Sequence, residues 1–391
     1  MFSLSKDELT KRGAEITVRE IKQQPELWDE VWDLYQTVKE EVDSFLKTVK
    51  ESAQEKKVRV IFTGAGTSQY VGDMVVPYLN KVGDKDTYLF QSIGTTDIVS
   101  SPEEYLAADE PTLLVSFARS GNSPESIATV ELADKVIKNI HHLTITCAPQ
   151  GALAKRSETE ENNFLFLEPA RSNDDGFAMT GSFTCMALTA LLIFDQTEVA
   201  QKKRYVHTMI NMGNDVITRE QEVQKIVDLN FDRIVYLGSG SLSGLTREAQ
   251  LKLLELTAGQ VATVFDSSMG FRHGPKSFVN ANTLVFDFVN NEPYTRDYDI
   301  DILEEVKADE IASGVIAIGQ KGQRNFSGQN FTFSEEKDLL PDGYLALADV
   351  VFAQTLAVMT SLKVNNTPDT PSKTGTVNRV VKGVTIHEYN K

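Results

Sequence analysis

Two short polar segments, each directly after an apolar run, carry the residue types that hold a phosphate group. They follow the runs 58–63 and 112–117 and lie about fifty residues apart. Glycine lets backbone N–H groups approach a ligand, and serine and threonine hydroxyls donate hydrogen bonds. A helix that begins after each segment would add its free N–H groups and its dipole. The residues concerned are Gly66, Thr67, Ser68, Arg119, Ser120 and Ser123.

Either segment alone could be an ordinary strand-to-helix turn, because glycine and serine are also common turn and capping residues. Two such segments favour a ligand site, since adjacent parallel strands end at the same edge of a sheet, where ligands bind. Arg119 could pair with a phosphate through two hydrogen bonds or could bond a nearby carboxylate.

The elements that must position these residues alternate along the chain. Apolar residues at helical spacing predict a short and a longer helix over 17–50, separated at Pro25. We then expect strands at 58–63, 86–91, 112–117, 143–147 and 164–167, with helices from 68, at 124–138 and at 184–197. This order predicts an α/β fold with a parallel sheet.

A second series repeats the opening of the first. Residues 233–241 match residues 59–67 in pattern, which indicates an internal duplication. We expect helices at 204–227, from the glycine loop to 259 and at 343–363, with strands at 233–237, 262–265, 283–288 and 314–318. The second series has no counterpart to the segment 119–123, so one phosphate site per chain is predicted.

Domain boundaries follow from these patterns. We expect N-terminal helices at 1–50, a first domain with the phosphate-binding loops at 51–215, a second domain at 216–364 and an irregular arm at 365–391. Proline, threonine and asparagine prevent a regular helix in the arm. Its apolar residues, among them Val377, Val384 and Ile386, indicate that the arm packs against the protein.

Composition limits the class of protein. The chain has 391 residues, 41% of them apolar, and a formal net charge of −17, which argues against a nucleic-acid or membrane-surface partner. The only cysteines, Cys147 and Cys185, predict neither a disulfide framework nor a zinc site. No signal peptide and no run of about eighteen uncharged apolar residues is found, so a cytoplasmic location is expected.

These motifs together resemble the sugar isomerase (SIS) family. Residues 248–255 resemble a helix of the isomerase domain of glucosamine-6-phosphate synthase, and 273–275 its His-Gly-Pro turn. The segments 271–276 and 376–381 are most similar to the bacterial galactosamine-6-phosphate isomerase/deaminase group, also called tagatose-6-phosphate ketose/aldose isomerases. The resemblance implies two tandem SIS domains, each a five-stranded parallel sheet in a three-layer, flavodoxin-like αβα arrangement.

The resemblance also implies roles for individual residues. Glu255 would shuttle a proton between carbons 1 and 2 of the open-chain sugar, and His273 would open the ring. Lys382, in a part of the arm similar to the lysine-bearing arm of the synthase, would form a Schiff base or stabilise charge. Thr180 and Lys252 would contact the substrate, although Thr180 could merely cap a helix and Lys252 could merely pair with Glu255.

The predicted function is conversion of D-galactosamine 6-phosphate to D-tagatose 6-phosphate and ammonium. A plain tagatose-6-phosphate ketose/aldose isomerase and a glucosamine-6-phosphate deaminase are close alternatives. A phosphosugar-sensing regulator without catalysis is an alternative of another class, but it would not need Glu255, His273 and Lys382 together. The chemistry requires no cofactor or metal, and the histidine of the resembled synthase acts in the neighbouring subunit, which implies a homodimer with shared active sites.

Overall fold

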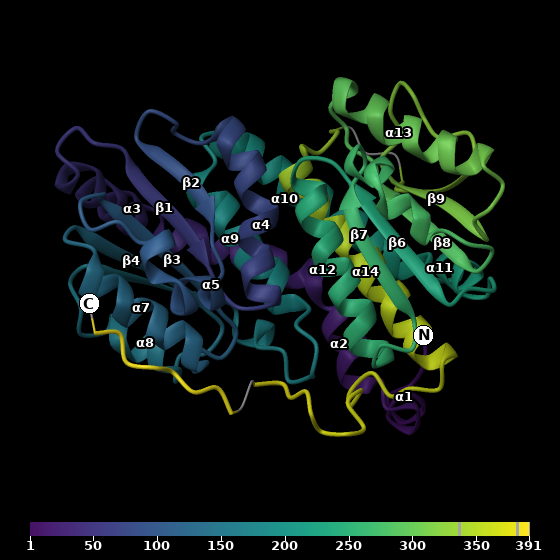
Figure 1. The fold of residues 1–391 in the computed structure, drawn as a ribbon, viewed down its shortest axis with the longest axis horizontal. Coiled ribbons are helices and arrows are strands. Elements are labelled where there is room, and N and C mark those ends of the chain that lie inside the picture. Colours follow the sequence, from purple (N-terminus) through teal and green to yellow (C-terminus); the bar gives the residue numbers. More distant parts are fainter. Residues whose placement is uncertain (335–337, 381–382, 391) are drawn as a thin grey trace. The chain divides into compact units, whose positions relative to one another are not determined.

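The computed structural model describes residues 1–334, 338–380 and 383–390. Two parallel five-stranded sheets organise these residues (Figure 1). The chain divides into two compact units, which we name by their sheets. The first-sheet unit comprises residues 27–174, 181–198 and 377–391, and the second-sheet unit comprises residues 1–26, 175–180 and 199–376. The arm is therefore divided: its residues up to 376 belong to the second-sheet unit, and those from 377 belong to the first-sheet unit.

The first sheet has the strand order β2-β1-β3-β4-β5, which is the flavodoxin-like order. Its strands are β1 (Val58–Thr63), β2 (Tyr88–Ser92), β3 (Thr112–Ala118), β4 (Ile140–Thr146) and β5 (Asn163–Leu167). All neighbours in it are parallel, and Thr63 at the end of β1 is paired with Ser116 of β3. The chain order reverses between β1 and β3, so their carboxyl ends form the switch point where ligands bind in such sheets.

Apolar side chains that alternate along β1 bury both faces of this sheet. Ile61 lies in a cluster with Ile98 of α5 (Thr95–Ser100) and Val130 of α7 (Pro124–Val136). Phe62 points to the opposite face, where its ring makes an edge contact at 5.4 Å with Phe194 of α9 (Gly181–Phe194). Because strand neighbours point to opposite faces, helices are required on both sides, which gives the three layers.

The remaining helices of this unit complete those layers. They are α3 (Gln24–Ser52), α4 (Thr67–Val82), α6 (Pro102–Tyr105) and α8 (Ala152–Ser157). Pro25 stands in the first turn of α3, and the shorter α2 (Glu15–Lys22) precedes it, so the predicted interruption is confirmed.

The second sheet repeats the first, with the order β10-β9-β8-β6-β7 and parallel neighbours throughout. Its strands are β6 (Arg233–Gly238), β7 (Ala262–Ser267), β8 (Thr283–Phe288), β9 (Gly314–Gly319) and β10 (Gln329–Thr332). The helices of this unit are α1 (Lys6–Arg12), α2, α10 (Val199–Thr218), α11 (Glu220–Val227), α12 (Ser241–Thr257), α13 (Pro293–Ala308) and α14 (Asp342–Lys363). The prediction of two α/β repeats with five-stranded parallel sheets is confirmed.

In the second-sheet unit, one predicted helix has the wrong bounds, and both a helix and a strand were not predicted. The helix expected at 204–227 is two helices, α10 and α11, which meet at Arg219. α13 was not predicted, because acidic residues dilute its apolar face. β10 was missed because it is only four residues long and mostly polar.

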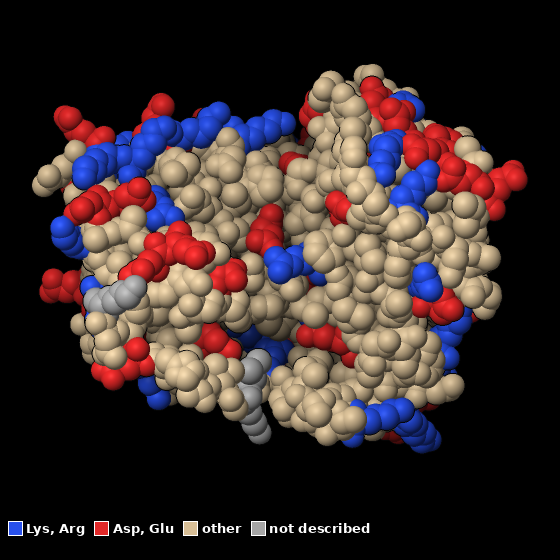
Figure 2. Space-filling model, viewed as in Figure 1, with Lys and Arg blue, Asp and Glu red and all other residues tan. Residues whose placement is uncertain are grey.

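α13 carries acidic side chains on its exposed side. Figure 2 shows a group of red side chains at the upper right, where Figure 1 places α13. Arg324 lies among them, 3.3 Å from Asp297 and 2.6 Å from Asp301. These surface pairs contribute little to stability, because water screens them.

By length and composition alone, α14 is long and apolar enough to cross a membrane. However, 94% of its apolar eighteen-residue stretch is buried inside the protein, where α14 packs against α10, α11 and α12. We therefore describe α14 as the central core helix of the second-sheet unit.

Candidate active site

The first predicted phosphate loop lies between β1 and α4, at the switch point of the first sheet. Gly66 precedes the first residue of α4 in a left-handed conformation (φ 57°), which favours glycine. A Cβ atom on Gly64 would lie 2.6 Å from atoms of Ser68, so only glycine fits there. The loop thus presents the first turn of a 16-residue helix, with the hydroxyls of Thr67 and Ser68, at a strand end.

The second predicted phosphate loop follows the adjacent strand, β3, and leads into α7. Gly121 has φ 64°, and Ser123 precedes the first residue of α7 without capping it through its side chain. The Ser120 hydroxyl accepts a hydrogen bond from the N–H of Asn122 at 3.3 Å. The structure therefore brings the two loops to neighbouring strand ends of one sheet, as the sequence predicted.

Arg119 has a partner that the sequence did not suggest. Arg119 is 6% exposed, and its guanidinium donates to the carbonyl of Arg379 in the C-terminal arm at 2.7 Å. Arg379 in turn donates to the carbonyl of Asp174 at 3.0 Å and to the side chain of Asn173 at 3.3 Å. Arg119 therefore connects the second loop to the arm, and any direct bond from it to a phosphate remains a prediction.

The loop that receives the arm also fixes the start of α9. The carboxylate of Asp174 is buried and accepts hydrogen bonds from the N–H groups of Gly181 (3.1 Å) and Ser182 (3.0 Å) and from the Ser182 hydroxyl (2.6 Å). A carboxylate at a helix N-terminus satisfies N–H groups and opposes the helix dipole. Thr180, the residue before α9, is buried and belongs to the second-sheet unit.

The arm is held by polar groups more than by its apolar residues. Val377 is 57% exposed, and Val384 and Ile386 are also exposed, whereas Val380 is half-buried, so the predicted apolar packing of the arm is present only in part. Beyond Arg379, the Tyr389 hydroxyl donates to Glu103 of α6 at 3.3 Å. Lys382 and the residue before it lie outside the described residues.

The proposed base, Glu255, lies on α12 in the second-sheet unit. Its carboxylate accepts a hydrogen bond from the Lys252 ammonium at 2.5 Å, and Glu248 lies 3.5 Å from the same ammonium. The side chains of Lys252 and Glu248 are almost completely buried, whereas that of Glu255 is 22% exposed. The pairing of Lys252 with Glu255, which the sequence left open as an alternative, is therefore present. Of the three charged groups, only the Glu255 carboxylate is partly exposed.

His273 lies in an exposed turn after β7, in the short helix Gly270–His273. Gly274 follows with φ 128°, which a residue with a side chain rarely adopts. Arg272 and Lys276 flank it and contact the Glu305 carboxylate at 2.6 Å and 2.5 Å. Hydrogen bonds from Lys276 and from Arg272 lower the pKa of Glu305, so this pairing holds the turn on α13. The turn is fixed while the His273 ring stays accessible.

The predicted residues thus fall into two groups. Gly66, Thr67, Ser68, Arg119, Ser120 and Ser123 belong to the first-sheet unit, whereas Thr180, Lys252, Glu255 and His273 belong to the second-sheet unit. Sequence analysis missed Asp174 and named Arg379 only within a motif. Among the described residues, no group of three or more histidine, cysteine, aspartate or glutamate side chains could hold a metal ion.

The SIS domain family model matches residues 54–194. D-galactosamine-6-phosphate deaminase AgaS of Shewanella sp. strain ANA-3 is 39% identical over 389 residues, which cover 99% of this chain and 96% of that protein.

Solved structures agree with this result. Tagatose-6-phosphate ketose/aldose isomerase from Escherichia coli is 38% identical, with a TM-score of 0.84 and coverage of 96% of this chain and 97% of its own. A Clostridium novyi NT protein provisionally given the same name is 42% identical, with a TM-score of 0.93 and coverage of 100% and 99%.

Proposed function

Because this chain belongs to the family of SIS-domain D-galactosamine-6-phosphate deaminases, we propose that it is an enzyme that converts D-galactosamine 6-phosphate and water to D-tagatose 6-phosphate and ammonium. The full-length similarity supports the reaction class. The observation that carries the site is the pair of hydroxyl-bearing loops at the switch point of the first sheet.

In this proposal, the two loops hold the phosphate. Backbone N–H groups at the start of α4 and α7 and the hydroxyls of Ser68, Ser120 and Ser123 supply the donors. Both helices direct their positive ends to the same sheet edge, which favours a dianion. Binding the phosphate leaves the sugar chain free to react at carbons 1 and 2.

Glu255 then moves the proton. It removes the proton from carbon 2 of the open-chain aldehyde and returns a proton at carbon 1, which converts the amine-bearing carbon into a ketimine. Water adds to this ketimine, and the carbon–nitrogen bond breaks to release ammonium and the ketose. The hydrogen bond from Lys252 supports this role because it orients the Glu255 carboxylate on α12.

His273 opens the sugar ring, and its exposed position supports action at the site of a second copy of the chain. We therefore propose a homodimer with shared active sites. Lys382 of the arm would stabilise the open-chain sugar or form a Schiff base with it. The two buried free cysteines are compatible with a reducing cytoplasm, which we propose as the location.

The decisive experiment measures ammonium release from galactosamine 6-phosphate and from glucosamine 6-phosphate in parallel. We expect the galacto compound to react faster. Since one structural relative is named as a ketose/aldose isomerase, isomerisation of tagatose 6-phosphate is the second candidate function. Ammonium release from neither amino sugar would contradict the deaminase and leave that second candidate to be assayed.

A Glu255→Gln variant tests the assigned base. We expect kcat to fall by about 10²–10⁴ because the glutamine cannot accept the proton. Binding of galactitol 6-phosphate, which has no carbonyl group and cannot react, should be nearly unchanged. Glu51→Gln is a matched control, since Glu51 is an exposed helix glutamate 3.8 Å from Lys47. Full turnover in Glu255→Gln would rule out Glu255 as the base.

A further inference from the structure

The glycine loop of the second sheet has the same backbone conformation as the first phosphate loop. Gly66 has φ 57° and ψ −127°, and Gly240 has φ 61° and ψ −131°. Both precede the first residue of a long helix that follows the first strand of its sheet. The second-sheet unit therefore contains a second loop of the phosphate-binding shape.

The surroundings of the two loops also correspond. The carbonyl of Gly64 accepts a hydrogen bond at 2.8 Å from the N–H of Thr95, three residues after β2. The carbonyl of Gly238 accepts one at 3.2 Å from the N–H of Ser268, directly after β7. A Cβ atom on Gly64 would lie 2.6 Å from Ser68, four positions later. A Cβ atom on Gly238 would likewise lie 2.8 Å from Leu242, four positions later. The duplication predicted from the sequence is thus repeated in detail, with Thr67 matching Ser241.

An internal carboxylate occupies the second loop. The N–H of Ser241, the first residue of α12, donates to Asp342 Oδ2 at 3.0 Å. The same oxygen lies 2.6 Å from the position of a Cβ atom on Gly240, so it fills the concave side of the loop. In the first loop, no described side chain accepts a hydrogen bond from the Thr67 N–H. The Ser241 N–H therefore has a carboxylate partner, whereas the matched Thr67 N–H has none among the described side chains.

The side chains around the second loop also differ from those around the first. The Ser239 hydroxyl donates to Asp299 at 2.5 Å, where the first loop has Ala65. The position of Ser68 is taken by Leu242, which is fully buried. A phosphate here would meet the carboxyl groups of Asp342 and Asp299 and would lack the hydroxyl that Ser68 supplies in the first loop.

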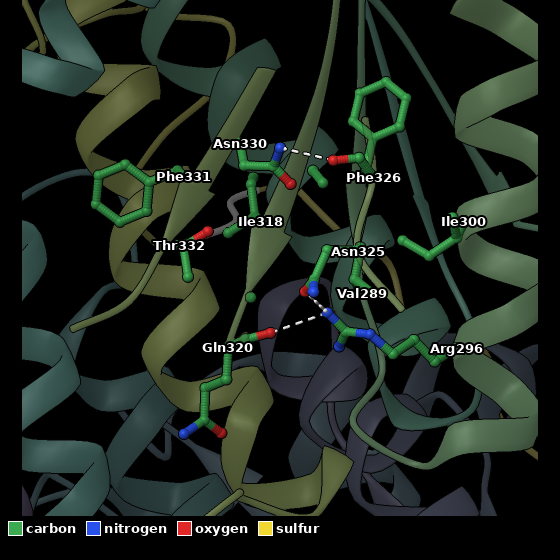
Figure 3. A pocket seen from close by; sticks show the side chains of 12 residues that line it. Val289, Arg296, Ile300, Ile318, Gln320, Asn325, Phe326, Asn330, Phe331 and Thr332 are labelled. Atoms are coloured by element: carbon green, nitrogen blue, oxygen red, sulfur yellow. Dashed lines mark hydrogen bonds between the residues drawn. The ribbon is translucent and has the colours of Figure 1, made fainter. Parts of the chain in front are cut away.

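Arg296 closes the neighbouring strand ends (Figure 3). Its buried guanidinium donates to the carbonyls of Asn290 and Gln320, both at 3.0 Å, and to the side chain of Asn325 at 2.9 Å. The cavity beside these residues encloses about 10 Å³, which is space for about one water molecule. The ends of β8 and β9 are therefore filled by protein groups at the place where β3 carries the second phosphate loop.

We propose that Asp342 is the built-in ligand of the second glycine loop, so that the duplicated phosphate site is closed and each chain binds one phosphorylated ligand, at the first-sheet unit. The carboxylate satisfies the N-terminus of α12 in the way that a phosphate would. This inference rests on the proposed phosphate role of the first loop.

Binding stoichiometry separates the two proposals. Equilibrium dialysis with galactitol 6-phosphate should give one molecule bound per wild-type chain. No binding would refute the phosphate role of the first loop, whereas two molecules per chain would overturn the closure by Asp342.

An Asp342→Ala variant tests whether the closed loop can be opened. We expect its Tm to fall, because the Ser241 N–H loses its partner, and inorganic phosphate to recover part of the loss. Phosphate should raise the Tm of Asp342→Ala by about 2–4 °C more than that of the wild type, and chloride at equal ionic strength should not. Asp342→Asn keeps an acceptor oxygen, so its Tm should lie between those of the other two proteins.

The control is Glu292→Ala. Glu292 accepts a hydrogen bond from the Thr295 N–H at the start of α13, so this variant also loses a helix cap but opens no glycine loop. Its Tm should fall without a phosphate-specific recovery. An Asp342→Ala protein that responds to phosphate no more than the wild type would overturn the inference. If Asp342→Ala does not fold, the number of galactitol 6-phosphate molecules bound per wild-type chain still tests the closure by Asp342.

Discussion

Burial of Glu168 at the end of β5 makes the stability of the first-sheet unit depend on pH. The residue is 5% exposed, and its only described hydrogen-bond donor is the Thr189 hydroxyl of α9, at 2.7 Å from Oε1. Burial raises the pKa of this carboxyl from 4.5 to about 8, because the charged form loses its hydration. The hydrogen bond from Thr189 offsets only part of that effect.

The sign of the dependence follows from proton uptake. Between pH 4.5 and 8 the folded protein keeps a proton that the unfolded chain releases, so stability falls as pH rises through this window and is constant above it. Each pH unit in the window costs about 1.4 kcal/mol. Relative to acid pH, the cost is about 3 kcal/mol at pH 7 and about 5 kcal/mol above pH 8.

A Glu168→Gln variant removes this titration and keeps an oxygen for Thr189. We expect the Tm of the variant, relative to wild type, to rise by on the order of 10 °C between pH 5 and pH 8, since 1 kcal/mol corresponds to about 2–4 °C in a unit of this size. The assay is thermal unfolding of both proteins across this range. Glu131→Gln, at an exposed site on α7, should follow the wild type at every pH. A constant difference in Tm between Glu168→Gln and wild type would refute the reasoning.

Two further variants test the phosphate loop and the arm. Ser68→Ala should weaken binding of galactitol 6-phosphate by about 10-fold or more, because a hydrogen bond to a charged group is lost, while Ser100→Ala at an exposed site should not; equal weakening for unphosphorylated galactitol would contradict a phosphate contact. Arg379→Ala should speed hydrogen exchange in residues 375–380 and 383–390 and lower kcat more than it changes KM. Arg379→Lys should not restore either, since lysine lacks the planar guanidinium that bonds both Asp174 and Asn173. Unchanged exchange would show that Arg379 does not hold the arm.

Local patterns in the sequence were sufficient for most of the fold. The strands expected at 58–63 and 283–288 have these bounds in the structure, because continuous apolar runs bounded by polar turns are typical of buried parallel strands. The register 233–241 onto 59–67 also predicted the shared loop. Where the signal was weak, as in the acidic α13 and the four-residue β10, the prediction failed.

The arrangement of the candidate site could be predicted only in part, because much of it depends on contacts between distant residues. The bonds from Arg379 to Asp174 join residues 205 positions apart, and that from Ser241 to Asp342 joins residues 101 positions apart. No periodicity or spacing encodes such pairs. The valines of the arm suggested apolar packing, but polar contacts are the main ones that hold it, between Asp369 and Thr17, between Arg379 and Asp174 and between Tyr389 and Glu103.

The duplicated loops show how one fold can serve two tasks. In both repeats the N–H groups at a helix start require an acceptor, since a buried helix end without one is costly. In the first repeat, the loop carries the hydroxyls of Thr67 and Ser68, and no described side chain accepts from the Thr67 N–H, which suits an incoming anion. In the second, Asp342 of α14 supplies the acceptor and thereby joins α14 to α12, the helix that carries Lys252 and Glu255. In our proposal, the Asp342 carboxylate prevents ligand binding at the second loop and holds in place α12, the helix that carries the proposed base, Glu255.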